Sequence, residues 1–169
     1  MIQLPTDRDL MIIMRGLPGS GKSTTVAAMQ AVLPRRMSTA VASADDYFMQ
    51  EGEYKFNPAL LPDAHNQSFL TAQKFVSVNK CDSDLGVLFV DNTNISAWEL
   101  SPYIALANAH KCAYTVLNID TSLTECLARN AKRTGEKRIP EHTLANMAMR
   151  MREEKLPPWW NQLSTESLG

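Results

Sequence analysis

The feature that most constrains the fold is the stretch RGLPGSGKST at residues 15–24, between an apolar run and a helix-forming segment. Gly16, four intervening residues and then Gly21-Lys22-Ser23 satisfy the pattern G-x-x-x-x-G-K-[ST] in the strand-to-helix context that gives it physical meaning. Glycines let successive backbone N–H groups point inward, and the start of a helix adds about half a positive charge. The stretch therefore predicts a phosphate-binding loop, the alternative being a tight glycine turn that only joins a strand to a helix.

The side chains of this loop indicate how a nucleoside triphosphate would be held. Lys22 can reach the terminal phosphates, and the Ser23 hydroxyl can bind a magnesium ion that itself bridges phosphate oxygens. The predicted nucleotide-binding residues are Gly16, Leu17, Pro18, Gly19, Ser20, Gly21, Lys22, Ser23 and Thr24.

Length and charge limit the remaining possibilities. A chain of 169 residues with 44% hydrophobic residues can bury one core but is short for two, so we expect a single domain over residues 1–169. Lysine plus arginine (17) nearly balances aspartate plus glutamate (18), which argues against a positive field over the whole surface. A polyanion would therefore have to be bound locally.

The compartment is inferred from the same composition. No apolar stretch approaches the roughly 20 residues of a membrane span, and the charged N-terminus is unlike a secretory signal. We therefore expect a soluble, cytoplasmic protein without a membrane partner. Reduced, buried thiols are expected because neither disulfide nor zinc-site spacing relates Cys81, Cys112 and Cys126.

Short apolar runs alternate with longer amphipathic segments, which is typical of βαβ units around a mostly parallel sheet. Strands are predicted at about residues 10–15, 39–43, 86–91 and 113–119. The predicted fold class is therefore α/β, a P-loop fold with a mostly parallel sheet of four to five strands flanked by helices. The tail over residues 156–169 is expected to be irregular.

Capping signals indicate where the helices begin. Asn57 followed by Pro58 is typical of an N-cap and a first-turn proline. Two later sites have capping-box spacing, with a serine at the cap and a glutamate three residues on: Ser96 with Glu99, and Ser122 with Glu125. The last helix is predicted from an apolar stripe at Leu144, Met147, Ala148 and Met151.

Two aspartates follow the second predicted strand. Ligands of open α/β sheets bind beyond the carboxyl ends of the strands, so Asp45 or Asp46 can face the terminal phosphate there. A carboxylate in that position can accept the proton of an attacking hydroxyl, as a general base does. Either aspartate could instead cap the short helix that follows.

A second polar cluster follows the third predicted strand. Asp91 comes directly after four apolar residues and is predicted to hold magnesium together with Ser23, directly or through water. Asn92 and Asn94 belong to the same cluster beside the loop, although turn chemistry alone could explain both.

A basic cluster lies within ten residues after the fourth strand and its helix signal. A charge run is usually a solvated face, but this one contains the hinge-like sequence Thr134-Gly135-Glu136. We expect a lid over about residues 129–140, in which a closing arginine would neutralise the charge on a moving phosphoryl group. The basic residues are Arg129, Lys132, Arg133, Lys137 and Arg138.

These motifs, taken in order and spacing over about residues 10–152, resemble the P-loop polynucleotide 5′-kinases, which include a phage kinase. Further segments resemble an AAA-type branch of stand-alone or fused kinases from bacteria, phages and eukaryotes. The resemblance to the family rests on residues 16–24, Asp45-Asp46-Tyr47, residues 91–94 and residues 129–133. The likeness to the branch rests on residues 54–57, Ala64-His65, residues 98–100 and Pro102-Tyr103.

The resemblance implies ATP-dependent phosphorylation of a hydroxyl on DNA or RNA, with nucleic acid as the partner. By position it implies that Lys22 and Ser23 handle ATP and Mg²⁺, that Asp45 is the base, and that Arg129 and Arg133 belong to the lid. One departure concerns the acceptor. The phage enzyme has an arginine three residues after its base, where this chain has Phe48.

Three other functions stay open. Related phage kinases phosphorylate the hydroxymethyl group of 5-hydroxymethyluracil in DNA, and they would need the same ATP-binding half. A small acceptor such as a nucleoside or sugar would suit the near-neutral charge. A module that binds ATP and hydrolyses it slowly is the alternative outside kinases, and Asp45 beside the loop argues against it.

A few single residues carry weaker expectations. His65 falls on the apolar face of its helix, which favours a core histidine over a substrate ligand. The aromatic side chains near Asp45 either stack on a base or sugar or pack beneath the lid, and these are Tyr47, Phe48 and Tyr54.

Overall fold

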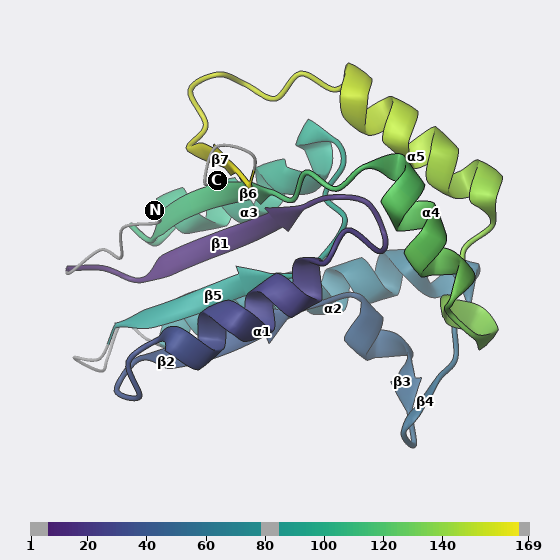
Figure 1. The fold of residues 1–169 in the computed structure, drawn as a ribbon. Helices are drawn as coiled ribbons and strands as arrows, with labels where there is room; N and C mark the ends of the chain where they lie inside the picture. The colour runs from purple at the N-terminus through teal and green to yellow at the C-terminus, as the bar shows by residue number, and fades with distance from the viewer. Residues whose placement is uncertain (1–6, 79–84, 166–169) are drawn as a thin grey trace.

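The computed structural model describes residues 7–78 and 85–165, and a twisted sheet lies at its centre (Figure 1). The sheet has five strands, and all of its neighbouring pairs run parallel. The predicted α/β class is confirmed. In spatial order the strands are β2 (Ser38–Ala42), β5 (Gly86–Val90), β1 (Leu10–Arg15), β6 (Ala113–Asn118) and β7 (Gln162–Ser164).

The central strand β1 is buried along its whole length. A parallel strand covered on both faces reads as a continuous apolar run, and the sequence LMIIM at residues 10–14 is such a run. In register, Leu10 of β1 pairs with Val87 of β5 and Ala113 of β6. Successive side chains of β1 point to opposite faces, so this strand contributes to the core on both sides of the sheet.

In the described part of the chain five α-helices surround the sheet, and they are α1 (Lys22–Val32), α2 (Leu61–Val78), α3 (Ala97–Ala109), α4 (Leu123–Ala131) and α5 (Glu141–Glu153). One face packs against α2 and α3, through side chains such as Val76 and Leu100. The other face packs against α1, through Val26. The helices α4 and α5 pack against each other through Cys126 and Leu144.

The capping signals in the sequence mark the observed helix starts. The Asn57 side chain accepts a hydrogen bond from the Ala59 N–H (3.0 Å) and opens the short 3₁₀ helix η2 (Pro58–Leu60), which continues into α2. At α3, the Glu99 carboxylate accepts from the Ser96 N–H (2.8 Å). At α4, the Ser122 hydroxyl accepts from the Glu125 N–H (3.2 Å). Each of these predicted starts is confirmed.

A small excursion separates β2 from α2. It contains the short helix expected after the two aspartates, the 3₁₀ helix η1 (Asp45–Phe48), and an antiparallel hairpin of β3 (Met49–Gln50) and β4 (Glu53–Tyr54) that was not predicted. Both turn residues of the hairpin have positive φ, 52° at Glu51 and 84° at Gly52. The hairpin projects beyond the edge of the main sheet (Figure 1).

The tail differs from the irregular segment expected over residues 156–169. Strand β7 adds to β6, with Leu163 opposite Leu117. The Asn161 side chain fixes the approach by donating to the Thr115 hydroxyl (2.7 Å). A strand of three residues is too short for apolar alternation to appear in the sequence, so only its pairing with β6 defines it.

Two expectations about composition can be compared with the described part of the chain. None of its helices is both long and apolar enough to cross a membrane. Cys112 and Cys126 are free and buried, as expected, whereas Cys81 lies outside the described residues.

Candidate active site

The loop between β1 and α1 has the backbone that its glycines predict. Gly19 has φ of +84°, in the left-handed region that favours glycine. A Cβ at Gly19 would also lie 3.2 Å from the Cys126 carbonyl oxygen of α4, and one at Gly16 would lie 2.8 Å from the Ser20 hydroxyl. The loop therefore curls tightly against α4 and leads into α1 at Lys22, whose side chain lies inside the curl.

Lys22 lies across the mouth of this loop. Its ammonium group donates to the carbonyl oxygens of Gly16 (3.0 Å) and Leu17 (2.9 Å), and the side chain is buried. Burial lowers the pKa of Lys22 to about 8, although the carboxylates of Asp91 and Asp45 act in the opposite direction. Burial thus disfavours the charged form of Lys22 more than the nearby carboxylates favour it, and the negative charge of a bound polyphosphate would stabilise the ammonium group.

Asp91 lies at the carboxyl end of β5 and faces the start of α1. It accepts a hydrogen bond from the Ser23 side chain, and burial raises the pKa of the Asp91 carboxyl against the opposing effects of Ser23 and Lys22. Within the described residues no group of three or more histidine, cysteine or acidic side chains could hold a metal ion. Mg²⁺ does not require such a group, because it is usually bound by one or two protein oxygens together with phosphate oxygens. The Ser23–Asp91 pair fits that chemistry.

The turns that follow β2 and β5 are tied together. The Asp91 N–H donates to the Ala42 carbonyl (2.9 Å), and the Ser43 hydroxyl donates to the Asp91 carbonyl (3.2 Å). The buried Asn92 side chain accepts from the Ala44 N–H (2.8 Å) and donates to the Ser68 hydroxyl of α2 (3.0 Å). These bonds fix the start of η1 relative to the end of β5.

Asp45 and Asp46 begin η1, and neither side chain caps it. Asp45 is exposed and accepts a hydrogen bond from the Tyr54 hydroxyl (3.0 Å). Burial and the neighbouring carboxylates of Asp45 and Asp91 raise the pKa of Asp46. The Asp45 carboxylate acts to raise the pKa of both Lys22 and Asp91.

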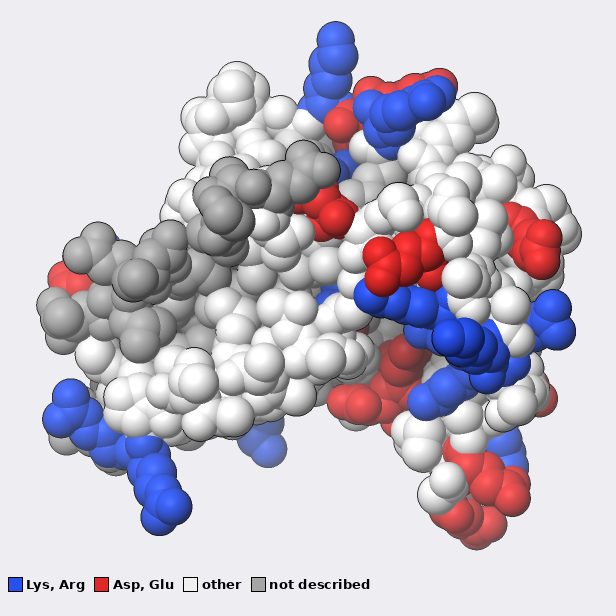
Figure 2. All heavy atoms as spheres, in the orientation of Figure 1, with Lys and Arg blue, Asp and Glu red and all other residues white. Residues whose placement is uncertain are grey.

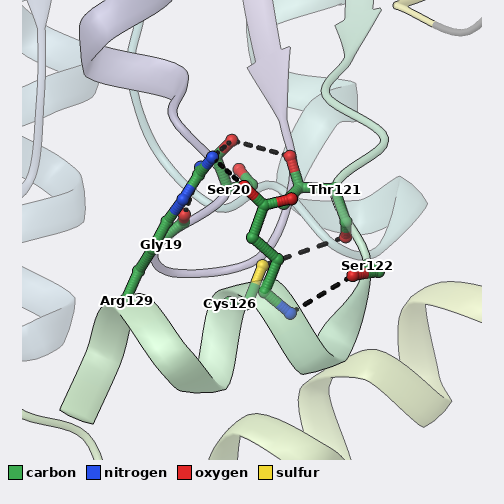
Figure 3. A network of polar contacts seen from close by, with 7 residues as sticks. Gly19, Ser20, Thr121, Ser122, Cys126 and Arg129 are labelled. Atoms are coloured by element: carbon green, nitrogen blue, oxygen red, sulfur yellow. Dashed lines mark hydrogen bonds and ion pairs between the residues drawn. The ribbon is translucent and has the colours of Figure 1, made fainter.

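Arg129 lies in the last turn of α4 and reaches the phosphate-binding loop (Figure 3). Its guanidinium donates to the carbonyl oxygens of Gly19 (3.0 Å) and Ser20 (3.2 Å) and pairs with Glu125 one turn earlier on the helix. The Thr121 hydroxyl donates to the same Ser20 carbonyl (2.8 Å). Arg129 thus supports the loop from the side of α4.

The segment between α4 and α5 carries the rest of the basic cluster. Figure 2 shows blue side chains gathered over α4 and the segment that follows it. Arg133 is half-buried and near enough to Lys22 to act on its pKa, and its guanidinium donates to the Lys137 carbonyl (3.4 Å). Asn130 closes the segment with bonds to both the N–H (3.0 Å) and the carbonyl (2.7 Å) of Ile139. The segment contains the 3₁₀ helix η3 (Gly135–Lys137).

With this geometry in place, a comparison with protein families gives a clear match. Residues 11–154 match AAA_33, a family described as an AAA domain. The chain belongs to the AAA_33 family. This AAA domain is also 37% identical over 108 residues to NEDD4-binding protein 2 of Homo sapiens. The aligned region is 64% of this chain but 6% of the human protein, so the chain corresponds to a small part of that relative.

Solved structures share the fold of this AAA domain at low sequence identity. A chain of the Pnkp1/Rnl/Hen1 RNA repair complex has a TM-score of 0.66 and 19% identity, covering 88% of this chain and 45% of that one. Kti12 of Chaetomium thermophilum, in complex with ADP-AlF3, has a TM-score of 0.62 and 16% identity, and the match covers 92% of this chain and 89% of that one. The APS kinase CysC of Mycobacterium tuberculosis, in complex with AMPPNP and APS, has a TM-score of 0.54 and 16% identity, and the match covers 94% of this chain and 90% of that one. The fold is thus that of P-loop kinases.

Not every expectation for single residues holds in this AAA domain. His65 is exposed on α2, so the expected core histidine is wrong. Phe48 is 1% exposed and packs with Tyr47, Tyr54 and Phe56, so it is a packed aromatic and not an open stacking surface; among the described residues its cluster contains none of the lid. The expectation for His65 was wrong because the buried face of α2 was assigned by spacing from Leu61, whereas Ala64 and Ser68 are buried in the first turns of that helix.

The roles of two residues near the site were not predicted from the sequence. One is Tyr54, which was expected only to stack or pack; the hairpin brings its hydroxyl to Asp45, and Gly52 in the two-residue turn was the sequence signal for that hairpin. The other is Arg15, which ends β1 with a buried guanidinium that donates to the carbonyls of Ile95 (2.9 Å) and Met151 (3.1 Å). The sequence signal for this buried arginine was its place at the end of the apolar strand β1.

Proposed function

We propose that this AAA domain is an ATP-dependent phosphotransferase whose acceptor is a hydroxyl group on nucleic acid, most specifically the 5′-hydroxyl end of DNA or RNA. The observation that carries the proposal is the position of Asp45. Asp45 is exposed at the start of η1, and the Asn92 side chain accepts a hydrogen bond from the adjacent Ala44 N–H (2.8 Å), so η1 begins beside the strand end that carries Asp91. This arrangement supports a base next to the proposed triphosphate site. The structural likeness to a chain of an RNA repair complex supports nucleic acid as the acceptor.

The reaction that this arrangement favours is an in-line transfer. The acceptor oxygen forms a bond to the γ-phosphorus, its proton passes to the Asp45 carboxylate, and the bond from the γ-phosphorus to the bridging oxygen breaks to release ADP. Lys22 and the backbone N–H groups of residues 16–24 would hold the β- and γ-phosphates. A magnesium ion held by Ser23 and Asp91 would neutralise charge on the same oxygens.

Two arginines have different proposed contributions. Arg133 is a half-buried residue of the lid that acts electrostatically on Lys22, which supports a direct role in stabilising charge on the moving phosphoryl group. Arg129 already donates to two loop carbonyls and pairs with Glu125, so its contribution includes holding the loop in shape. The lid itself corresponds to about residues 129–140.

A small-molecule acceptor is the second candidate, and three observations favour it. Phe48 is buried in an aromatic cluster at the position where the phage kinase that this chain resembles has an arginine for the acceptor phosphate. The near-neutral net charge of −1 also suits an uncharged acceptor. The likeness to an APS kinase supports the same alternative.

Identifying the product tests the proposal. The protein is mixed with Mg-ATP and, in separate reactions, with 5′-hydroxyl DNA, 5′-hydroxyl RNA, duplex DNA containing 5-hydroxymethyluracil, and free nucleosides, and the products are analysed by mass spectrometry. Addition of one phosphoryl group to the 5′ ends is expected. A Lys22→Ala variant purified in parallel excludes a contaminating kinase. Phosphorylation of the nucleosides alone, or of no acceptor, would overturn the nucleic-acid proposal.

A further inference from the structure

The hydroxyl of Tyr54 donates a hydrogen bond to Asp45 Oδ1 at 3.0 Å. We propose that Tyr54 is a positioning residue, which holds the Asp45 carboxylate in the orientation needed to receive the acceptor proton and couples that orientation to the lid. This inference rests on the proposed function, because it assigns Asp45 the role of base. It assigns a role to a residue that the sequence analysis treated only as a stacking or packing aromatic.

An exposed carboxylate needs such a partner. Asp45 begins a 3₁₀ helix and its side chain caps nothing, so the helix itself does not hold the carboxylate in place. A general base is effective only when it is aligned with the proton that it removes, and a hydrogen bond from a third group is a common way to achieve this. One oxygen bonded to Tyr54 leaves the other free to face the acceptor hydroxyl.

The ring of Tyr54 is itself held in place from several directions. It makes edge contacts with Phe48 (6.0 Å between ring centroids) and lies parallel to Phe56 (6.4 Å, 5° between planes). The backbone of the hairpin is anchored by the Lys55 N–H, which donates to the Phe48 carbonyl (2.8 Å). A phenol held this firmly is better suited to orient its partner than to leave whenever an acceptor arrives.

The lid contributes to the same arrangement. The Lys137 ammonium lies over the Tyr54 ring, 4.7 Å from its centroid, and the Glu136 carboxylate accepts a hydrogen bond from the Phe56 N–H. Arg133 also acts electrostatically on the Tyr54 hydroxyl. Lid residues thus contact the Tyr54 ring and the segment that follows it, so a lid in this position supports the ring whose hydroxyl meets the base.

The test is a double-mutant cycle on transfer to a short 5′-hydroxyl DNA oligonucleotide. Tyr54→Phe keeps the ring and its contact with Lys137 and removes only the hydroxyl. We expect kcat to fall roughly tenfold or more, as for other partners that orient a reacting group, with the KM for ATP unchanged. The same substitution in an Asp45→Asn background should cause no further loss, because the group that Tyr54 orients is already disabled.

The control is Tyr114→Phe, a tyrosine of β6 that packs against the core away from Asp45, which should transfer at the wild-type rate. Thermal unfolding and the affinity for Mg-AMPPNP are measured for every variant, since a merely structural role for Tyr54 would lower both. If Tyr54→Phe transfers as fast as the wild type, or slows Asp45→Asn by the same factor, the positioning role is overturned and the proposed function stands. If the wild-type protein phosphorylates no acceptor in the panel, the proposed function fails and this inference fails with it.

Discussion

The Asn92 side-chain oxygen accepts a hydrogen bond from the backbone N–H of Ala44 at 2.8 Å, and through it the turn after β5 holds the start of η1. The same side chain donates to the Ser68 hydroxyl of α2 at 3.0 Å. Asn92 is 6% exposed, so both bonds are made away from water. The position of Asp45 relative to Asp91 therefore depends on the buried side-chain amide of a third residue, Asn92.

Asn92→Ala should destabilise the protein, because it leaves the Ala44 N–H without its partner in a buried environment, whereas the Ser68 hydroxyl keeps its hydrogen bond with the Tyr103 hydroxyl (3.0 Å). Unsatisfied buried groups of this kind cost about 1–3 kcal/mol of unfolding free energy. Urea unfolding measures the change, with Asn66→Ala on the exposed side of α2 as the control. Equal midpoints for the two variants would mean that the Asn92 bonds contribute nothing to stability.

The fold could be predicted where local patterns and packing agree. The run LMIIM at residues 10–14 is buried on both faces in the structure, and Ser96 with Glu99 caps α3 as its spacing predicts. Strand β7 could not be predicted, because three residues carry no periodicity and β7 exists only through its pairing with β6. His65 failed for the converse reason: its spacing fits one helical face, but the tertiary packing of α2 buries the adjacent face instead.

Gly19→Ala and Gly52→Ala form a matched pair, since both glycines have φ of +84°. An alanine in the left-handed region costs roughly 1–2 kcal/mol at either position. At Gly52 the added Cβ meets no atom within 4 Å, whereas at Gly19 it lies 3.2 Å from the Cys126 carbonyl. Gly19→Ala should therefore lose more stability and also bind Mg-AMPPNP more weakly, because the loop must shift.

Thermal unfolding and isothermal titration calorimetry with Mg-AMPPNP measure both effects. Wild-type nucleotide affinity in Gly52→Ala is the control, because that glycine lies in the hairpin turn and not in the loop. A Gly19→Ala variant that binds AMPPNP as tightly as Gly52→Ala would show that this loop does not form the nucleotide site.

Glu136→Ala should loosen the lid from the hairpin, because the Glu136 carboxylate accepts a hydrogen bond from the Phe56 N–H. A bond worth about 1 kcal/mol corresponds to roughly a fivefold change in the equilibrium for local opening. Limited digestion with trypsin should therefore cut after Lys137 or Arg138 several times faster than in the wild type. Glu153→Ala, an exposed position near the end of α5, should be cut at the wild-type rate; equal rates for the two variants would contradict the tether.

The candidate site could be predicted for those residues that come directly after a strand of the sheet. Lys22, Asp45 and Asp91 come after consecutive parallel strands, and such ends meet at one edge of a sheet. The partners that orient them come from elsewhere. Tyr54 reaches Asp45 from a hairpin of two-residue strands, too short to leave a pattern in the sequence.

The rate of transfer in Asp45→Asn and Asp46→Asn variants tests the central claim most directly, because the two side chains are adjacent in η1 and only one is proposed as the base. With Mg-ATP and a 5′-hydroxyl oligonucleotide, Asp45→Asn should lower kcat by about 10²–10⁴, the contribution typical of a general base. It should still bind Mg-AMPPNP as the wild type does, and Asp46→Asn should remain active. Wild-type transfer by Asp45→Asn, or an equal loss in Asp46→Asn, would contradict the account.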